Sequence, residues 1–186
     1  MESVIFEFIK ANLHNPVLDR VVAVVTHVGG IPIWLVIAFT FLFFKKYRRS
    51  SLILFAAVGG SGFMSRIILK PLFARERPFH AFDIELFTRA PTSYSLPSTH
   101  AAMAIAGAIV LFTVNKRWGI AAFILAFLVG FSRVYLMVHY VSDVLAGFAL
   151  GIIVAVSAIF IGRKVFDFAE KRWKWCNNFF ADKGWN

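Results

Sequence analysis

The stretch VLAGFALGIIVAVSAIFIG, residues 144–162, contains no charged side chain and decides the class of fold. A helix that crosses the hydrocarbon core of a bilayer needs about 20 largely apolar residues, because each residue rises only about 1.5 Å along the helix axis. This stretch has that length and that composition. It therefore predicts a transmembrane helix.

The composition of the whole chain also indicates a membrane protein. Of its 186 residues, 59% are hydrophobic, 22 are phenylalanine, and the mean hydropathy is +0.72. Soluble domains contain roughly 45–50% apolar residues, so a soluble domain of this length could not bury so much apolar surface. The net charge of +10 would suggest nucleic-acid binding in a soluble protein, but no soluble basic domain is visible, and we expect no nucleic-acid partner.

Four other apolar blocks are long enough, or nearly so, to cross a bilayer: residues 31–44, 51–69, 101–115 and 118–138. Near the N-terminus, apolar residues at helical spacing alternate with charges, which is typical of an interfacial amphipathic helix. Asn15 and Pro16 then predict the N-cap and first turn of another helix that reaches about Val28. That helix is either a short sixth span or a surface helix.

We therefore expect an all-α fold, a polytopic membrane bundle of five to six transmembrane helices with an interfacial N-terminal helix. The chain divides into N-terminal interfacial or short helices (residues 1–28), a transmembrane domain (29–162) and a basic, aromatic cytoplasmic tail (163–186).

The distribution of basic residues predicts the orientation of this bundle. Three basic groups fall on one side when the crossings are counted: residues 45–49, residues 116–117, and the tail after residue 162. Basic loops face the cytoplasm in most membrane proteins. The same count places residues 70–99, His139 and Asp143 together at the opposite, extracytoplasmic end. This placement does not depend on whether the helix that ends near Val28 crosses the membrane.

Three short polar segments at this outer end interrupt the apolar chain. They are Lys70 with Arg77-Pro78, the run Pro97-Ser98-Thr99-His100, and Ser132-Arg133 with His139 and Asp143. Ionisable groups beside a membrane core are costly and usually have a function. Two histidines, one carboxylate and three cations are residue types that suit the handling of a phosphate.

The two histidines can divide the chemistry of phosphoryl transfer. Asp143 follows His139 by four residues, so both lie on one face if a helix begins there. A carboxylate that accepts a hydrogen bond from Nδ1–H fixes the tautomer of the imidazole and leaves Nε2 free to attack. His100 can protonate the departing oxygen as a general acid. The pattern predicts transfer through a phosphohistidine.

Phosphate oxygens would be neutralised by Lys70, Arg77 and Arg133, with further donors from the Ser98 hydroxyl and the backbone N–H groups of residues 98–100 at a helix start. Each residue alone also has a simpler interpretation. A basic residue at the end of a span is usually a snorkelling anchor, and Ser98 could be only an N-cap. The combination of spacings on one side favours a catalytic site.

The pattern Lys-x6-Arg-Pro, Pro-Ser-x-His, Ser-Arg-x5-His-x3-Asp resembles the three-part signature of the type 2 phosphatidic acid phosphatase superfamily, over roughly residues 29–162. The resemblance implies a metal-independent phosphatase without a cofactor. It implies His139 as nucleophile, Asp143 as the residue that orients it and His100 as the acid. The phosphate would be held by Lys70, Arg77, Ser98, Thr99 and Arg133. The family often has glycine where this chain has Thr99, whose side chain adds bulk and a hydroxyl.

The compact length resembles small bacterial members that act on undecaprenyl diphosphate or phosphatidylglycerophosphate in the cytoplasmic membrane. We favour undecaprenyl diphosphate, because an outward-facing site is where that carrier lipid is released; phosphatidic acid is another possible substrate. Phe79, Phe82, Leu86 and Phe87 form either an apolar lip for a lipid tail or the core of their loop. The oligomeric state is left open.

Three other functions compete with a hydrolase. A lipid phosphotransferase would pass the phosphate from the histidine to an alcohol instead of water. A transporter or channel would place charges in the middle of its spans, where this chain has none. A non-catalytic lipid-binding module would have no need of every motif side chain.

Overall fold

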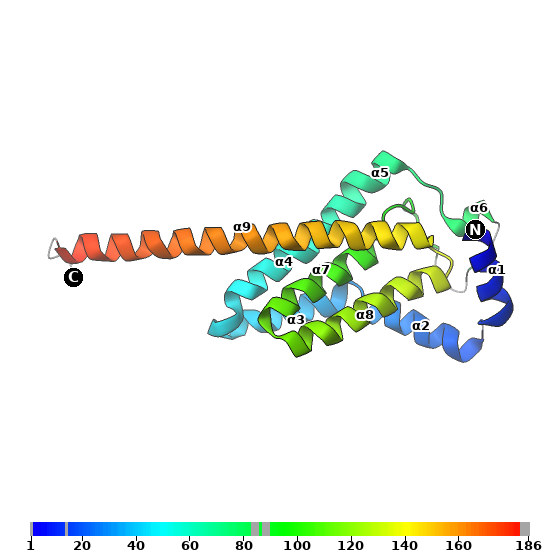
Figure 1. Cartoon of the computed structure of the whole chain (residues 1–186), viewed down its shortest axis with the longest axis horizontal. Helices are drawn as coiled ribbons and strands as arrows, with labels where there is room; N and C mark the ends of the chain where they lie inside the picture. Colours follow the sequence, from blue (N-terminus) through cyan, green and yellow to red (C-terminus); the bar gives the residue numbers. More distant parts are fainter. Residues whose placement is uncertain (1, 14, 83–85, 87–89, 183–186) are drawn as a thin grey trace.

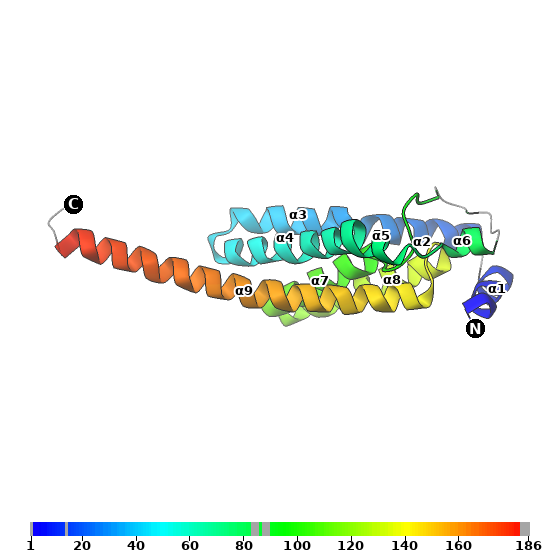
Figure 2. The ribbon, with the colours of Figure 1, turned by 90° about the horizontal axis from the view of Figure 1, so that it is seen from above.

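The computed structural model describes residues 2–13, 15–82, 86 and 90–182, and every regular element in these residues is helical, as expected. The helices are α1 (Glu2–Asn12), α2 (Pro16–Val28), α3 (Ile31–Phe43), α4 (Arg48–Phe63), α5 (Lys70–Phe73), α6 (Pro78–Ala81), α7 (Thr99–Val114), α8 (Lys116–Tyr135) and α9 (Val141–Asp182). They form an elongated bundle, and α9 projects well beyond one end of it (Figures 1 and 2).

Each expected apolar block coincides with a helix. Within the described residues, three continuous segments are long and apolar enough to cross a membrane: Lys45–Ala81, Lys116–Tyr135 and Val141–Lys174. The pair α2 and α3, bent by 41° at Gly29 and Gly30, qualifies as a fourth if it is counted as one span. Helix α7 is also apolar but has only 16 residues.

Helix ends follow local sequence signals. The Asn15 side chain accepts a hydrogen bond of 2.8 Å from the N–H of Leu18, and Pro16 occupies the first turn of α2, which confirms the predicted start of that helix. The Asn115 side chain caps α8 in the same way. Between α4 and α5, a π-helical turn (Met64–Leu69) continues the helix up to Lys70.

Helix α7 lies at the centre of the bundle, between α4, α8 and α9. Six of its ten buried residues are alanines or Gly107, so neighbouring helices can approach its backbone closely. The indole ring of Trp34 on α3 packs directly over Gly107, and only 1% of Trp34 is exposed. A Cβ atom at position 107 would lie 2.2 Å from that ring.

We expect Gly107→Ala to destabilise the bundle by about 1–3 kcal/mol, because the buried indole must move to admit a methyl group. Thermal unfolding in detergent would detect this as a lower Tm. Gly59→Ala is the matched control, since a Cβ at position 59 would meet no atom of the described residues within 4 Å. Equal Tm values for the two variants would show that the contact between α3 and α7 is not tightly packed.

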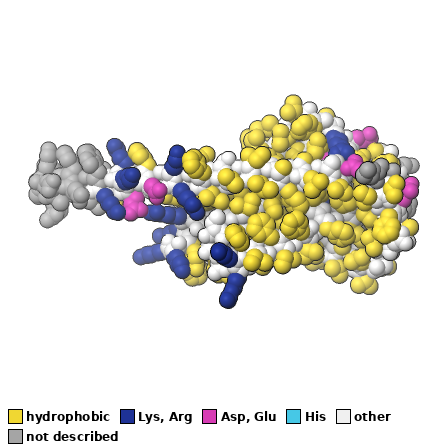
Figure 3. Space-filling model, in the orientation of Figure 1, with side chains coloured by type: hydrophobic (Ala, Val, Ile, Leu, Met, Phe, Trp, Pro, Cys, Tyr) yellow, Lys and Arg dark blue, Asp and Glu magenta, His cyan; other side chains and the backbone are white. Residues whose placement is uncertain are grey.

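The basic residues of the helix turns gather where α9 leaves the bundle (Figure 3). The rings of Tyr47 and Trp118 lie 5.9 Å apart, which brings the turn between α3 and α4 next to the turn between α7 and α8. Arg49 forms a 2.9 Å ion pair with Glu170 on α9. The three basic groups therefore share one end of the molecule.

Candidate active site

The three polar segments meet at the opposite end of the bundle, each at the end of a helix. Lys70 follows the π-helical turn, Arg77 precedes α6, Ser98 precedes α7, and the connection from α8 to α9 carries His139. Their side chains are almost completely buried; the exposed fractions are 3% for Lys70, 4% for Arg77, 0% for Ser98, 8% for Arg133, 2% for His139 and 0% for Asp143. Buried charges require partners.

His139 and Asp143 lie together, although not on one helix. Helix α9 begins at Val141, so His139 belongs to the preceding turn, where its N–H donates to the Arg133 carbonyl over 3.2 Å. Its Nδ1 lies 3.4 Å from Oδ2 of Asp143. Because Nε2 is on the other side of the ring, it points away from the carboxylate and lies 3.5 Å from Nη1 of Arg77.

His139 is held in its neutral form by its surroundings. Burial lowers the pKa of His139 well below the ordinary value of 6.5; the positive charges of Arg133, Arg77 and Lys70 lower it further, against the hydrogen bond to Asp143. A neutral imidazole with Nδ1 directed at a carboxylate carries its electron pair at Nε2. This is the form that a nucleophile requires at neutral pH.

Two of the predicted phosphate-binding cations also hold the loop that precedes α7. Arg77 donates from Nε to the Ser93 carbonyl over 2.6 Å and from Nη1 to the Val138 carbonyl over 2.7 Å. Lys70 donates from Nζ to the carbonyl of Ser95 over 3.1 Å and to that of Tyr94. These bonds connect the first motif to the loop that precedes the second motif and to the turn that carries His139.

Two buried donors of the site have no hydrogen-bond partner within the part of the chain that the structure describes: Oγ of Ser98 and Nε of Arg133. Ser98 occupies the N-cap position of α7, but its hydroxyl does not cap the helix, and its N–H donates to the Asp143 carbonyl over 2.9 Å. Of the three backbone donors expected for a phosphate, the one at residue 98 is therefore already used. A buried donor without a partner is costly, so both side chains are suited to binding an anion.

His100 and Thr99, the other two polar residues of the second motif, contact different segments of the chain. The His100 ring lies against Gly30, where a Cβ atom would be 3.0 Å from Cδ2 and 3.3 Å from Nε2. The hydroxyl of Thr99 lies 2.7 Å from Oγ of Ser65, within hydrogen-bonding distance. The hydroxyl that distinguishes Thr99 from glycine is therefore engaged by the helix beside it.

Four residues of the site were not predicted as site residues. Ser95 donates from Oγ to Oδ2 of Asp143, Thr26 accepts from Nη1 of Arg133 over 2.9 Å, and Arg75 donates to Oδ1 of Asp143 over 2.7 Å. Arg66 is close enough to act electrostatically on Lys70, Arg77 and His100. Only Arg66 carries a clear sequence signal, as a charge inside the apolar block 51–69.

The residues of the predicted apolar lip do not share one environment. Phe79 is buried, with 7% exposed, and packs in the loop core, whereas Phe82 is 45% exposed and contacts Phe6 of α1 at a ring separation of 5.9 Å. Phe87 lies outside the described residues. Phe82 is thus the described aromatic of the lip that remains open to a ligand.

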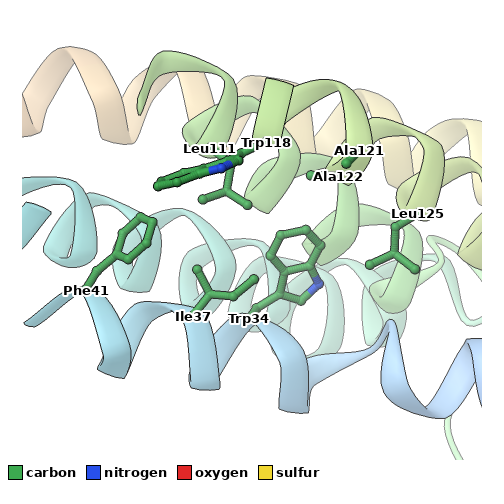
Figure 4. Close-up of a pocket in the computed structure, with 8 residues that line it drawn as sticks. All are labelled: Trp34, Ile37, Phe41, Leu111, Trp118, Ala121, Ala122 and Leu125. Carbon is green, nitrogen blue, oxygen red and sulfur yellow. The ribbon is translucent and has the colours of Figure 1, made fainter. Parts of the chain in front are cut away.

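A cavity of about 390 Å³ lies between α3, α7 and α8, and no residue of the three polar motifs lines it (Figure 4). The side chains around it come from helices that face one another, and all are apolar: Trp34, Ile37, Phe41, Leu111, Trp118, Ala121, Ala122 and Leu125. Without an ionisable group it has no means of binding or cleaving a phosphate.

Comparisons with known proteins identify the family of this chain. The family model described as PAP2 superfamily matches residues 50–166. An undecaprenyl-diphosphatase of Sulfolobus acidocaldarius is 35% identical over 64% of this chain, and the match spans 58% of that protein's length. Phosphatidylglycerophosphatase B of Bacillus subtilis is 32% identical, with 87% of this chain and 81% of the relative covered.

A crystal structure described as the first transmembrane PAP2 type phosphatidylglycerolphosphate phosphatase from Bacillus subtilis has the same fold. It superposes with a TM-score of 0.71 at 29% identity and covers 88% of this chain and 86% of its own. These relatives are phosphatases, which confirms the family and the class of enzyme expected from the three motifs.

Proposed function

Because this chain belongs to the PAP2 superfamily, we propose that it is an integral membrane lipid phosphatase that works through a phosphohistidine at His139. The observation that carries the proposal is the pair of buried donors, Oγ of Ser98 and Nε of Arg133, in the same cluster as the neutral His139. An anionic phosphate would satisfy both donors.

In the first step, Nε2 of His139 attacks phosphorus, an N–P bond forms, and the bond from phosphorus to the lipid oxygen breaks. His100 gives its proton to that oxygen. In the second step, water attacks phosphorus, its proton passes to His100, the N–P bond breaks, and inorganic phosphate leaves. Asp143 keeps the proton of His139 on Nδ1 throughout.

The cations of the site stabilise the charge on the transferring group. Lys70, Arg77 and Arg133 act electrostatically on both histidines. Preorganised charge of this kind is the main catalytic contribution in phosphoryl transfer. An anionic phosphate would also offset the repulsion between these cations and a proton on His100, so substrate binding itself would prepare the acid.

We propose that the reaction needs no metal ion. Several cations already surround the position of the phosphate, and a divalent metal would add to their mutual repulsion. The same charges perform the neutralisation for which a metal is used in other phosphoryl-transfer enzymes.

For the substrate, we propose undecaprenyl diphosphate, with phosphatidylglycerophosphate as the second candidate. Each is the substrate class named for one of the relatives above. Both lipids carry a second phosphate group beyond the one that is cleaved, and Arg66 places an additional cation near Lys70 and Arg77. Phosphatidic acid has only one phosphate and would leave this charge unused.

We further propose that the site faces the extracytoplasmic side. The basic turns and the basic part of α9 lie at the other end of the bundle (Figure 3), and anionic lipid attracts such residues to the cytoplasmic surface.

The test is phosphate release by the purified protein from a panel of detergent-solubilised lipids, with and without EDTA. We expect turnover of undecaprenyl diphosphate and phosphatidylglycerophosphate to exceed that of phosphatidic acid by about tenfold or more, the effect of about 1.4 kcal/mol of additional binding, and no loss of activity in EDTA. Activity that disappears in EDTA and returns with a divalent metal would refute the metal-free reaction. Labelled phosphate that appears on added alcohols and not in solution would identify a phosphotransferase.

A further inference from the structure

The Asp143 carboxylate is completely buried and accepts hydrogen bonds on both oxygens. Oδ2 accepts from the hydroxyl of Ser95 and from the N–H of Tyr140 over 3.0 Å, and it faces Nδ1 of His139. Oδ1 accepts from Nη1 of Arg75 over 2.7 Å. The two oxygens therefore have separate tasks: one faces the nucleophile, and the other is held by a cation.

Arg75 is itself fixed from several directions. Nη1 also donates to Oγ of Ser142 over 2.8 Å, and Nη2 forms a 3.0 Å ion pair with Glu2 of α1. The guanidinium carbon lies 3.9 Å from the centre of the Tyr140 ring, in cation–π contact. Glu2 in turn accepts from the Ser142 hydroxyl over 2.7 Å. A guanidinium with this many partners has little freedom to follow a ligand.

We propose that Arg75 is a positioning residue of the phosphatase, which holds the Asp143 carboxylate in the orientation that presents Oδ2 to His139, and that Glu2 anchors Arg75 from α1. The inference rests on the proposed function, because it assigns Arg75 a part in activating the same nucleophile. It also makes the N-terminal helix part of the support of the site.

A buried carboxylate without a compensating charge is unfavourable, so the removal of Arg75 would leave Asp143 free to rotate or to recruit another cation. Either change would misplace the ring of His139 while leaving the phosphate-binding residues Lys70, Arg77 and Arg133 in position. The expected consequence is slower chemistry with little change in substrate binding. A residue at the mouth that attracts the headgroup would have the opposite effect, a higher KM with unchanged kcat.

The experiment compares Arg75→Gln, Arg75→Lys and Glu2→Gln with the wild-type protein, using a lipid that the wild type hydrolyses. We expect kcat to fall on the order of 10- to 100-fold for Arg75→Gln, with KM within about threefold. A loss of this size is typical when a hydrogen-bond partner that orients a functional side chain is removed. Arg75→Lys should recover part of the loss, since lysine supplies the charge without the planar fork. Glu2→Gln should lose less than Arg75→Gln.

The matched control is Arg49→Gln, which breaks an arginine–carboxylate pair of 2.9 Å at the other end of the bundle. Its kcat and KM should match those of the wild type. Single-turnover hydrolysis with the protein in excess then separates positioning from misfolding: Arg75→Gln should convert all of the lipid with a lower rate constant, whereas a partly misfolded variant would keep the wild-type rate constant in its folded fraction.

Unchanged kcat in Arg75→Gln, or a higher KM alone, would overturn the inference. A wild-type single-turnover rate constant in Arg75→Gln, with activity lost only through a smaller folded fraction, would also count against it, because Arg75 would then support the fold. Failure of the proposed function would look different: the wild-type protein would release no phosphate from any lipid of the panel.

Discussion

Replacement of His139 with alanine is expected to abolish phosphate release, with a loss of at least about 10⁴-fold in kcat, because the atom that forms the bond to phosphorus is removed. The neighbouring cations and hydroxyl would remain, so the variant should still bind phosphate. The measurement is the turnover of the best lipid of the panel, together with a search for acid-labile labelled phosphate on the protein after a single turnover.

The matched control is His27→Ala, which removes an exposed histidine of α2. It should retain wild-type turnover and the labelled intermediate. If His139→Ala kept substantial activity, or if labelled phosphate were found on another residue, the assignment of the nucleophile would be wrong. A parallel thermal unfolding experiment should show that His139→Ala is folded, since the change leaves the helices intact.

Replacement of His100 with glutamine should reduce turnover of the lipid substrates by about 10²- to 10⁴-fold, the usual contribution of a general acid. The size of the loss should depend on the leaving group. An aryl phosphate such as p-nitrophenyl phosphate releases a stable phenolate that needs little protonation, so its first step should be much less affected than that of a lipid.

Hydrolysis of the phosphohistidine should also be slower in the His100 variant. Without His100, the attacking water loses its base, and the phosphohistidine should accumulate. We therefore expect the variant to show a burst of about one nitrophenolate per protein followed by slow turnover, and no burst with a lipid substrate. Equal losses with both leaving groups and no accumulated intermediate would argue that His100 binds the phosphate instead of transferring a proton.

Much of the fold could be predicted from sequence because its signals are local. The apolar block 144–162 identifies a spanning helix by length and composition, without knowledge of its neighbours. Asn15 and Pro16 mark the start of α2 because a cap acts within one turn. The motif residues of the site were likewise visible, because a charge beside an apolar run is unusual in any context.

The supporting contacts of the site could not be predicted in this way. Ser95 and Arg75 precede Asp143 by 48 and 68 residues, and Thr26 precedes Arg133 by 107. No local pattern identifies such pairs, since serine, threonine and arginine are ordinary residues of loops and helix ends. Which of them lies beside the carboxylate depends on how α2, the loop before α7, and α9 pack together.

The tertiary structure also corrected the basis of one prediction. The spacing of His139 and Asp143 suggested two residues on one helix, but α9 begins between them, and the turn held by the Arg133 carbonyl brings them together. The sequence by itself thus predicted the membrane bundle, the shared end of the three motifs and the chemical groups of the candidate site. Only the packing of distant helices decided the orientation of each group, because hydrogen bonds depend on positions in space that short-range patterns do not encode.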